Sequence, residues 1–174
     1  MTPRKATSLL IGLLFLLFVS ASAASNACAQ QKASTSAKQL IGVWKLISLK
    51  TEANGKTWEP YGPNPRGLFF FDRSGYYAVL QFSPDIPKFA ANSRDKGTPE
   101  ENRAVVLGSN AHFGKYAVNE KEGFFTVRAE AGTYPNWVGV DQKRIFSITG
   151  DELKITNPIT STGGKSTLVL KRVK

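Results

Sequence analysis

The sequence has 174 residues, 41% of them hydrophobic, and a formal net charge of +10 at pH 7. This length suits one domain with its own hydrophobic core. Its single cysteine excludes an internal disulfide, and its lysines and arginines are scattered rather than gathered in a block. We therefore expect a solvated basic surface and no nucleic-acid partner.

The start of the chain has the layout of a secretory signal peptide. Arg4 and Lys5 precede an apolar run, residues 9–19, and small residues follow. This run of about 11 residues is too short for a helix across a bilayer of roughly 30 Å. Cleavage fits after Ala23 or after Ala29, so we assign residues 1–29 to a signal peptide and expect a periplasmic or secreted protein.

Cys28 allows a second interpretation, in which it carries a lipid. The preceding Ser25-Asn26-Ala27 lacks the leucine usual before a lipidated cysteine, and it is far from the apolar run. We prefer that Cys28 is unimportant or leaves with the signal peptide. Membrane association is expected only if Cys28 is lipidated.

Residues 30–38 are rich in Ala, Ser, Gln, Thr and Lys without periodicity, which predicts a flexible leader. The folded domain is expected over residues 39–174. In its first strand, alternation places Trp44, Leu46 and Ser48 on one face. Asn54-Gly55 then predicts a two-residue hairpin turn, because both residues tolerate positive φ.

A proline-rich corner, residues 60–67, feeds the next strand. Its prolines fix φ and remove backbone donors, which excludes a helix or a central strand there. Arg66 stands near the end of the corner, and only Gly67 separates it from the apolar run of residues 68–71. We expect the corner at the rim of a barrel, with Arg66 beside the opening.

Thr98-Pro99-Glu100-Glu101 is the clearest helix start, with Thr98 as cap and Glu101 completing a capping box. This helix should end near Gly108. The polar residues 88–97 before it form the longest connection and a candidate lid.

Short strands separated by turns make up the rest of the chain. In order, the expected strands are residues 42–50, 67–71, 76–82, 112–119, 124–132, 142–149, 153–157 and 166–173. Regular succession of short strands favours a closed sheet, which removes sticky edges. The sequence therefore predicts an all-β fold: an eight-stranded antiparallel up-and-down barrel with one short helix inserted between strands 3 and 4.

Four segments, in this order, resemble the bacterial lipocalin-like domain family. They are residues 40–46 with their Gly-x-Trp element, the proline corner 61–67, the helix start 97–101, and residues 134–142, Tyr-Pro-Asn-Trp-Val-Gly-Val-Asp-Gln. The resemblance covers about residues 39–173. It implies a lipocalin-like barrel of the calycin kind with an internal cavity. Related folds include carriers of small apolar molecules and a minority of isomerases or cyclases, so the fold alone does not decide the function.

Strand alternation indicates which polar side chains face the interior. His112 and Tyr116 are expected inside from one strand, and Gln142 and Arg144 from another. The expected ligand-binding residues are Arg66, Tyr76, His112, Tyr116, Glu130, Trp137, Gln142 and Arg144.

Glu130 has two interpretations. The apolar face of its strand contains Phe125, Val127 and Ala129, which puts Glu130 outside. If Glu130 lies inside, it must pair with Arg144, because a charge in a barrel interior needs a partner.

His112 is the only histidine, and its reference pKa of about 6.5 allows acid or base chemistry. A hydrogen-bonded structural imidazole is the alternative. A lone histidine without neighbouring acidic or cysteine ligands does not indicate a metal site, and no nucleotide loop or nucleophile elbow is present in the sequence. We expect neither a metal nor a cofactor.

Trp44 is expected to be structural. The resemblance places it at the closed end of the barrel, with Arg172 covering its ring as a cation–π pair.

These features predict an exported, monomeric barrel that binds a small apolar or amphipathic molecule. One alternative is a cofactor-free isomerase or cyclase, in which His112 or Glu130 moves a proton. The other is a structural barrel filled by its own side chains.

Overall fold

The computed structural model describes residues 34–174. The predicted signal peptide, its cleavage positions and Cys28 lie outside the described residues. None of the helices from residue 34 onward is long and apolar enough to cross a membrane.

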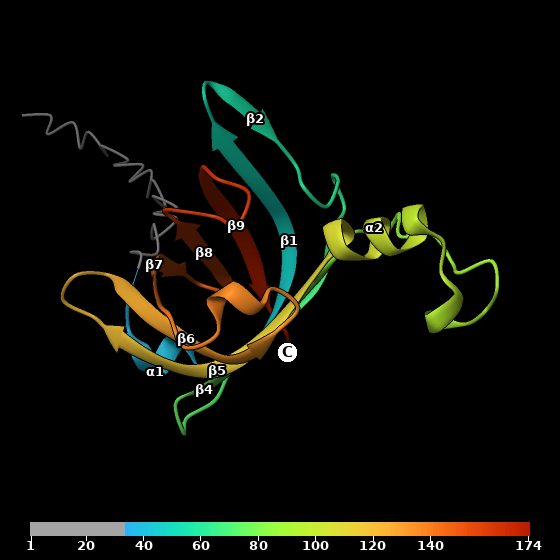
Figure 1. Ribbon diagram of the computed structural model, residues 1–174. Coiled ribbons are helices and arrows are strands. Elements are labelled where there is room, and N and C mark those ends of the chain that lie inside the picture. Colours follow the sequence, from blue (N-terminus) through green and yellow to red (C-terminus); the bar gives the residue numbers. More distant parts are fainter. Residues whose placement is uncertain (1–33) are drawn as a thin grey trace, which may run out of the picture. The chain divides into compact units, whose positions relative to one another are not determined.

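Antiparallel strands close into a barrel (Figure 1). The barrel strands are β1 (Gly42–Ala53), β3 (Arg66–Phe71), β4 (Tyr76–Phe82), β5 (Ser109–Asn119), β6 (Phe124–Gly132), β7 (Asp141–Thr149), β8 (Glu152–Asn157) and β9 (Lys165–Arg172). Each pairs with the next, and β9 pairs with β1 to complete the circle. The predicted eight-stranded up-and-down barrel is confirmed.

One strand was not predicted. β2 (Lys56–Trp58) pairs with the end of β1 and extends this hairpin beyond the barrel wall. Asn54 and Gly55, with φ values of 51° and 71°, make the turn between them, as their positive-φ tolerance predicted.

The inserted helix is also confirmed. α2 (Pro99–Gly108) lies between β4 and β5, after a short 3-10 helix, η1 (Arg94–Lys96). The Glu101 amide donates to Thr98 Oγ1 at 3.2 Å, and the Thr98 amide donates to Glu101 Oε2 at 2.9 Å. These two bonds are the predicted capping box, and they satisfy backbone donors that the first turn leaves free.

The segment before β1 differs from the flexible leader that its composition predicted. Ser34 and Ile148 exchange backbone hydrogen bonds of 2.6 and 2.7 Å, and Thr35 Oγ1 donates to the Glu120 carbonyl at 2.8 Å. The short helix α1 (Ala37–Leu40) then buries Leu40 completely. Pairing with β7 and burial of Leu40 therefore hold residues 34–40 against one end of the barrel.

Trp44 lies at this end and is fully buried. Its indole Nε1 donates to the Leu40 carbonyl at 2.8 Å. The guanidinium carbon of Arg172 lies 4.0 Å from its ring centroid, so the predicted contact between these residues is confirmed. Arg172 also donates to the carbonyls of Ile41 and Gln39, which ties the segment before β1 to the last strand.

The inward face of β1 changes along the strand. Trp44 and Leu46 are buried, as alternation predicted, but the pairing with β9 shifts between Leu46 and Ser48. A bulge changes the alternation. Leu49 and Thr51, rather than Ser48, therefore continue the buried face toward the other end of the barrel.

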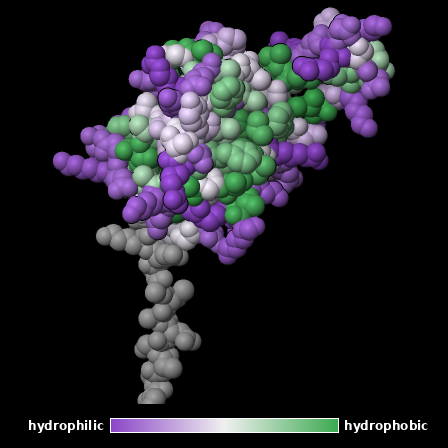
Figure 2. Space-filling view, turned by 90° about the horizontal axis from the view of Figure 1, so that it is seen from below, coloured by the Kyte–Doolittle hydropathy of each residue, from purple (hydrophilic) through white to green (hydrophobic). Residues whose placement is uncertain are grey.

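Apolar side chains also gather on one face of the surface, bordered by polar groups (Figure 2). The large apolar side chains exposed on β4 and β5 are Tyr76, Leu80, Phe82 and Phe113. They alternate with the inward residues of the same strands, so they belong to the outer wall.

We expect Trp44→Ala to destabilise the protein by roughly 3–5 kcal/mol, because it leaves a large cavity in the core. It also removes the cation–π contact with Arg172. The measurement is the free energy of unfolding in urea. Trp58→Ala is the matched control, since Trp58 is 38% exposed on β2 and its loss should cost less than about 1 kcal/mol. Equal effects of the two substitutions would contradict the structural role of Trp44.

Candidate functional site: the barrel cavity

The end of the barrel opposite α1 opens into a cavity with two parts. The outer chamber offers about 250 Å³ to the centre of a water molecule, and the inner chamber about 40 Å³. Both chambers are lined by Gln81, Asn110, Trp137, Arg144 and Asn157, which we call the junction. The two chambers are therefore adjacent and meet at these side chains.

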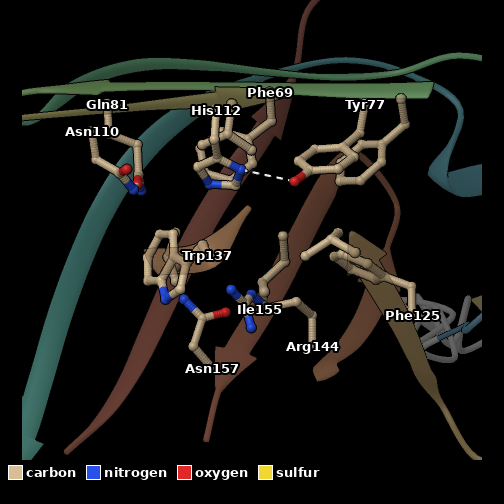
Figure 3. A pocket seen from close by; sticks show the side chains of 14 residues that line it. Phe69, Tyr77, Gln81, Asn110, His112, Phe125, Trp137, Arg144, Ile155 and Asn157 are labelled. Atoms are coloured by element: carbon tan, nitrogen blue, oxygen red, sulfur yellow. Dashed lines mark hydrogen bonds between the residues drawn. The ribbon is translucent and has the colours of Figure 1, made fainter. Parts of the chain in front are cut away.

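The inner chamber is largely apolar and aromatic (Figure 3). Its walls include Phe69, Phe71, Val79, Phe125, Ile155 and Leu168, with His112 and Tyr77 as polar members. The outer chamber adds Tyr61 from the proline corner, Val106 and Leu107 from α2, Tyr134 and Ile159. The proline corner and the Tyr134–Trp137 turn thus share this chamber, but the candidate lid, residues 88–97, lines neither chamber.

His112 and Tyr77 form an uncharged polar pair. The tyrosine hydroxyl lies 2.9 Å from His112 Nδ1 (Figure 3). Burial, and then the positive charge of Arg144, lower the pKa of His112 to about 4. Burial raises the pKa of Tyr77 to about 12. At neutral pH the imidazole is therefore neutral and the phenol keeps its proton.

Arg144 carries a buried positive charge. It projects inward from β7 and is only 7% exposed. Its guanidinium donates to the Lys143 carbonyl at 3.0 Å and to Gln142 Oε1 at 2.6 Å, and it lies 5.9 Å from the Trp137 ring centroid. Burial lowers its pKa to about 10, so it remains charged at neutral pH.

No carboxylate of residues 34–174 compensates this charge. Among the described residues, no Asp or Glu oxygen lies within 4.0 Å of the Arg144 guanidinium. The chamber linings contain no Asp or Glu either. Arg144 is thus the one formal charge that residues 34–174 present to the two chambers.

The amides at the junction are partly satisfied. Asn110 Nδ2 donates to Gln81 Oε1 at 2.9 Å, and Asn157 Nδ2 donates to Ser166 Oγ at 3.0 Å. Asn157 Oδ1, however, is buried and has no hydrogen-bond partner among residues 34–174. Orphaned buried polar atoms are uncommon, and here the atom belongs to a residue that lines both chambers.

Among the predicted site residues, His112, Trp137 and Arg144 line the cavity. Gln142 instead holds the Arg144 guanidinium. Tyr116 packs its ring against Phe71, and its hydroxyl donates to the Asp72 carbonyl at 2.9 Å in the β3–β4 turn, away from both chambers.

Arg66 and Tyr76, two of the predicted ligand-binding residues, line neither chamber. Phe69 and Phe71 face the core, so alternation turns Arg66 to the outer face although it stands at the mouth end of β3. Tyr76 is 43% exposed, with the Lys115 ammonium 5.4 Å from its ring centroid. Its neighbour Tyr77 is the tyrosine that faces inward.

Glu130 lies on the exposed side of β6, so the pair with Arg144 is not formed. The pairing with β5 shifts here: Phe113 lies opposite Ala131 and Gly114 opposite Ala129. Glu130 is the extra residue of this bulge. The solvent-facing interpretation is the one that the structure shows.

Sequence reasoning missed Tyr77, Gln81, Asn110 and Asn157. Tyr77 and Gln81 share the inward face of β4 with Val79, a signal that alternation within residues 76–82 contains. Asn157 shares the face of Leu153 and Ile155 in its expected strand, so alternation contained a signal for it, whereas Asn110 precedes the expected start of its strand and its position gave none. Among residues 34–174, no group of three His, Cys, Asp or Glu side chains is placed to hold a metal ion.

A closed antiparallel barrel with a chamber open at one end defines a small β-barrel protein with an interior site. A model of the lipocalin-like domain matches residues 41–173, and the chain belongs to this family. The match confirms the resemblance seen in the sequence. No curated protein matches the chain.

The state of His112 gives a pH prediction. The unfolded chain takes up a proton near pH 6.5, whereas the folded imidazole does so only near pH 4. Acidification therefore favours unfolding, and the free energy of unfolding should fall between pH 6.5 and 4 by on the order of 2 kcal/mol from this group.

The measurement is urea unfolding of the wild type and His112→Gln at pH 7.0, 6.0 and 5.0. The variant should lose less stability over this range, because the carboxylates titrate equally in both proteins. Parallel pH profiles, or an NMR pKa of His112 near 6.5, would contradict the buried neutral imidazole.

Proposed function

We propose that this protein binds a small, largely apolar molecule in its barrel cavity. The observation that carries the proposal is the outer chamber of about 250 Å³, which adjoins an aromatic inner chamber at a polar junction. Ligand sites commonly combine apolar walls with a few polar groups that fix orientation.

Exposed apolar side chains around the opening support this proposal. Val106, Leu107 and Ile159 line the outer chamber and are 71%, 56% and 77% exposed. Such exposure is unfavourable in water, and the body of a bound ligand would cover part of it.

The alternatives have less support. The half of the barrel near Trp44 is packed by its own side chains, as the filled-barrel alternative requires, but the mouth half is hollow. For the isomerase or cyclase alternative, a histidine with a pKa of about 4 is a weak base at neutral pH. Glu130, the other candidate proton carrier, is exposed on β6.

Binding is tested with N-phenyl-1-naphthylamine, a neutral apolar dye that fluoresces on leaving water. We expect saturable binding of one dye per protein. Asn110→Phe, which places a ring in the junction, should weaken binding at least tenfold. Ala111→Phe is the matched control, because the next residue along β5 faces the outer wall.

Equal binding by the Asn110→Phe and Ala111→Phe variants would place the dye outside the cavity. Absence of dye binding to the wild type would favour a filled barrel. Circular dichroism of both variants checks that the fold is kept.

We also propose that the protein is exported, on the basis of the sequence of residues 1–29. When the full chain is expressed in a Gram-negative host, intact-mass spectrometry of the periplasmic extract should find a chain that begins at Ala24 or at Gln30. An uncleaved chain in the cytoplasm would contradict export. A chain that begins at a lipid-modified Cys28 in the membrane fraction would contradict the preferred interpretation of that cysteine.

A further inference from the structure

We infer that the ligand of this cavity is an organic carboxylate, with its anionic head at Arg144 in the junction and its apolar body toward the mouth. The inference rests on the proposed binding function and adds to it the charge and the orientation of the ligand.

The first argument is the uncompensated charge of Arg144. Burying a cation without an anion is costly, and buried guanidinium groups are normally paired. In residues 34–174 the Arg144 side chain is hydrogen-bonded only to one carbonyl and one amide oxygen, through Nη1 and Nη2. The planar guanidinium has five N–H donors, and their forked geometry matches a carboxylate. A carboxylate would supply both the missing charge and further acceptors.

The second argument is the sign of the charge in the cavity. The described residues that line both chambers include no Asp or Glu, and Arg144 is their only formal charge. His112 and Tyr77, which face the same space, form a neutral pair joined at 2.9 Å. The site therefore presents a net positive potential at neutral pH, which attracts anions and repels ammonium groups.

The third argument concerns orientation. The inner chamber offers about 40 Å³ to the centre of a water molecule, which suits a small polar head group, whereas the outer chamber offers about 250 Å³. Arg144 lines both chambers, and its guanidinium lies close to Asn157 and Trp137 in the junction (Figure 3). With an anionic head at Arg144, the larger outer chamber is the one that better accommodates the apolar body. Val106, Leu107 and Ile159 lie there to contact it.

A different result is expected if Arg144 has only a structural role and does not bind the ligand. If Gln142 and the Trp137 ring, with its centroid 5.9 Å away, satisfy the guanidinium, the cavity should not favour anions. The two interpretations therefore predict different orders of binding affinity for ligands that have the same tail and different head groups.

The experiment compares octanoate, 1-octanol and octylammonium by isothermal titration calorimetry at pH 7.5 and fixed ionic strength. We expect the wild type to bind octanoate roughly 10- to 100-fold more tightly than octanol, as a charge-assisted hydrogen bond predicts. Octylammonium should bind more weakly than octanol.

Arg144→Gln should abolish the preference for octanoate while keeping the binding of octanol. Lys143→Gln is the matched control: it removes the same charge from the adjacent residue of β7, whose exposed side chain lies 3.9 Å from the Phe124 ring centroid. This control should keep the full preference. If Arg144→Gln fails to fold, the ranking of the three ligands by the wild type still decides.

Equal binding of octanoate and octanol by the wild type would overturn the inference. A preference that survives Arg144→Gln, or that Lys143→Gln also abolishes, would overturn it as well. The neutral dye separates this failure from failure of the proposed function. If the wild type binds the dye but does not prefer octanoate, the cavity binds apolar molecules without an anion anchor. If neither the dye nor any octyl ligand binds, both proposals fail.

Discussion

Closure of the sheet between β1 and β9 is the constraint on which the rest of this structure depends. The two strands pair from Trp44 opposite Arg172 to Glu52 opposite Lys165, and this pairing removes both edges of the barrel. Once the sheet is closed, alternate residues of each barrel strand face the interior, and the interior must be either packed or hollow. Trp44 and Arg172 stand where this seam meets the packed end, so one contact fills the base and ties the first strand to the last.

The interior changes character from one end to the other. Near Trp44 it is filled with aliphatic and aromatic side chains, whereas near the mouth asparagine, glutamine, histidine and arginine replace them. An interior arginine without a carboxylate is hard to justify by stability alone, because packing with an apolar side chain is usually at least as stable. The closed barrel thus places one buried cation, Arg144, at the inner end of the open outer chamber. The functional proposals rest on this arrangement.

Much of the fold followed from local sequence signals. The Asn54-Gly55 turn, the Thr98 capping box and most of the strands were predicted, since each depends on backbone preferences or alternation over a few residues. β2 was missed because three exposed residues give no hydrophobic pattern. The segment from Ser34 to Lys38 was predicted to be flexible because its polar composition gives no sign of the backbone pairing between Ser34 and distant Ile148.

The sequence alone determined the barrel class, the helix between β4 and β5, and the inward placement of His112 and Arg144. Only the tertiary structure decided which polar residues meet at the cavity. Bulges at Ile47 and Glu130 changed the alternation of two strands, and the register of β3 in the closed sheet placed Phe69 and Phe71 inside and Arg66 outside. The tertiary structure also decided that Arg144 has no acidic partner among the described residues, because an ion pair in a barrel forms between side chains of strands that are distant in sequence. Those relations arise from register and closure, which no short stretch of sequence contains.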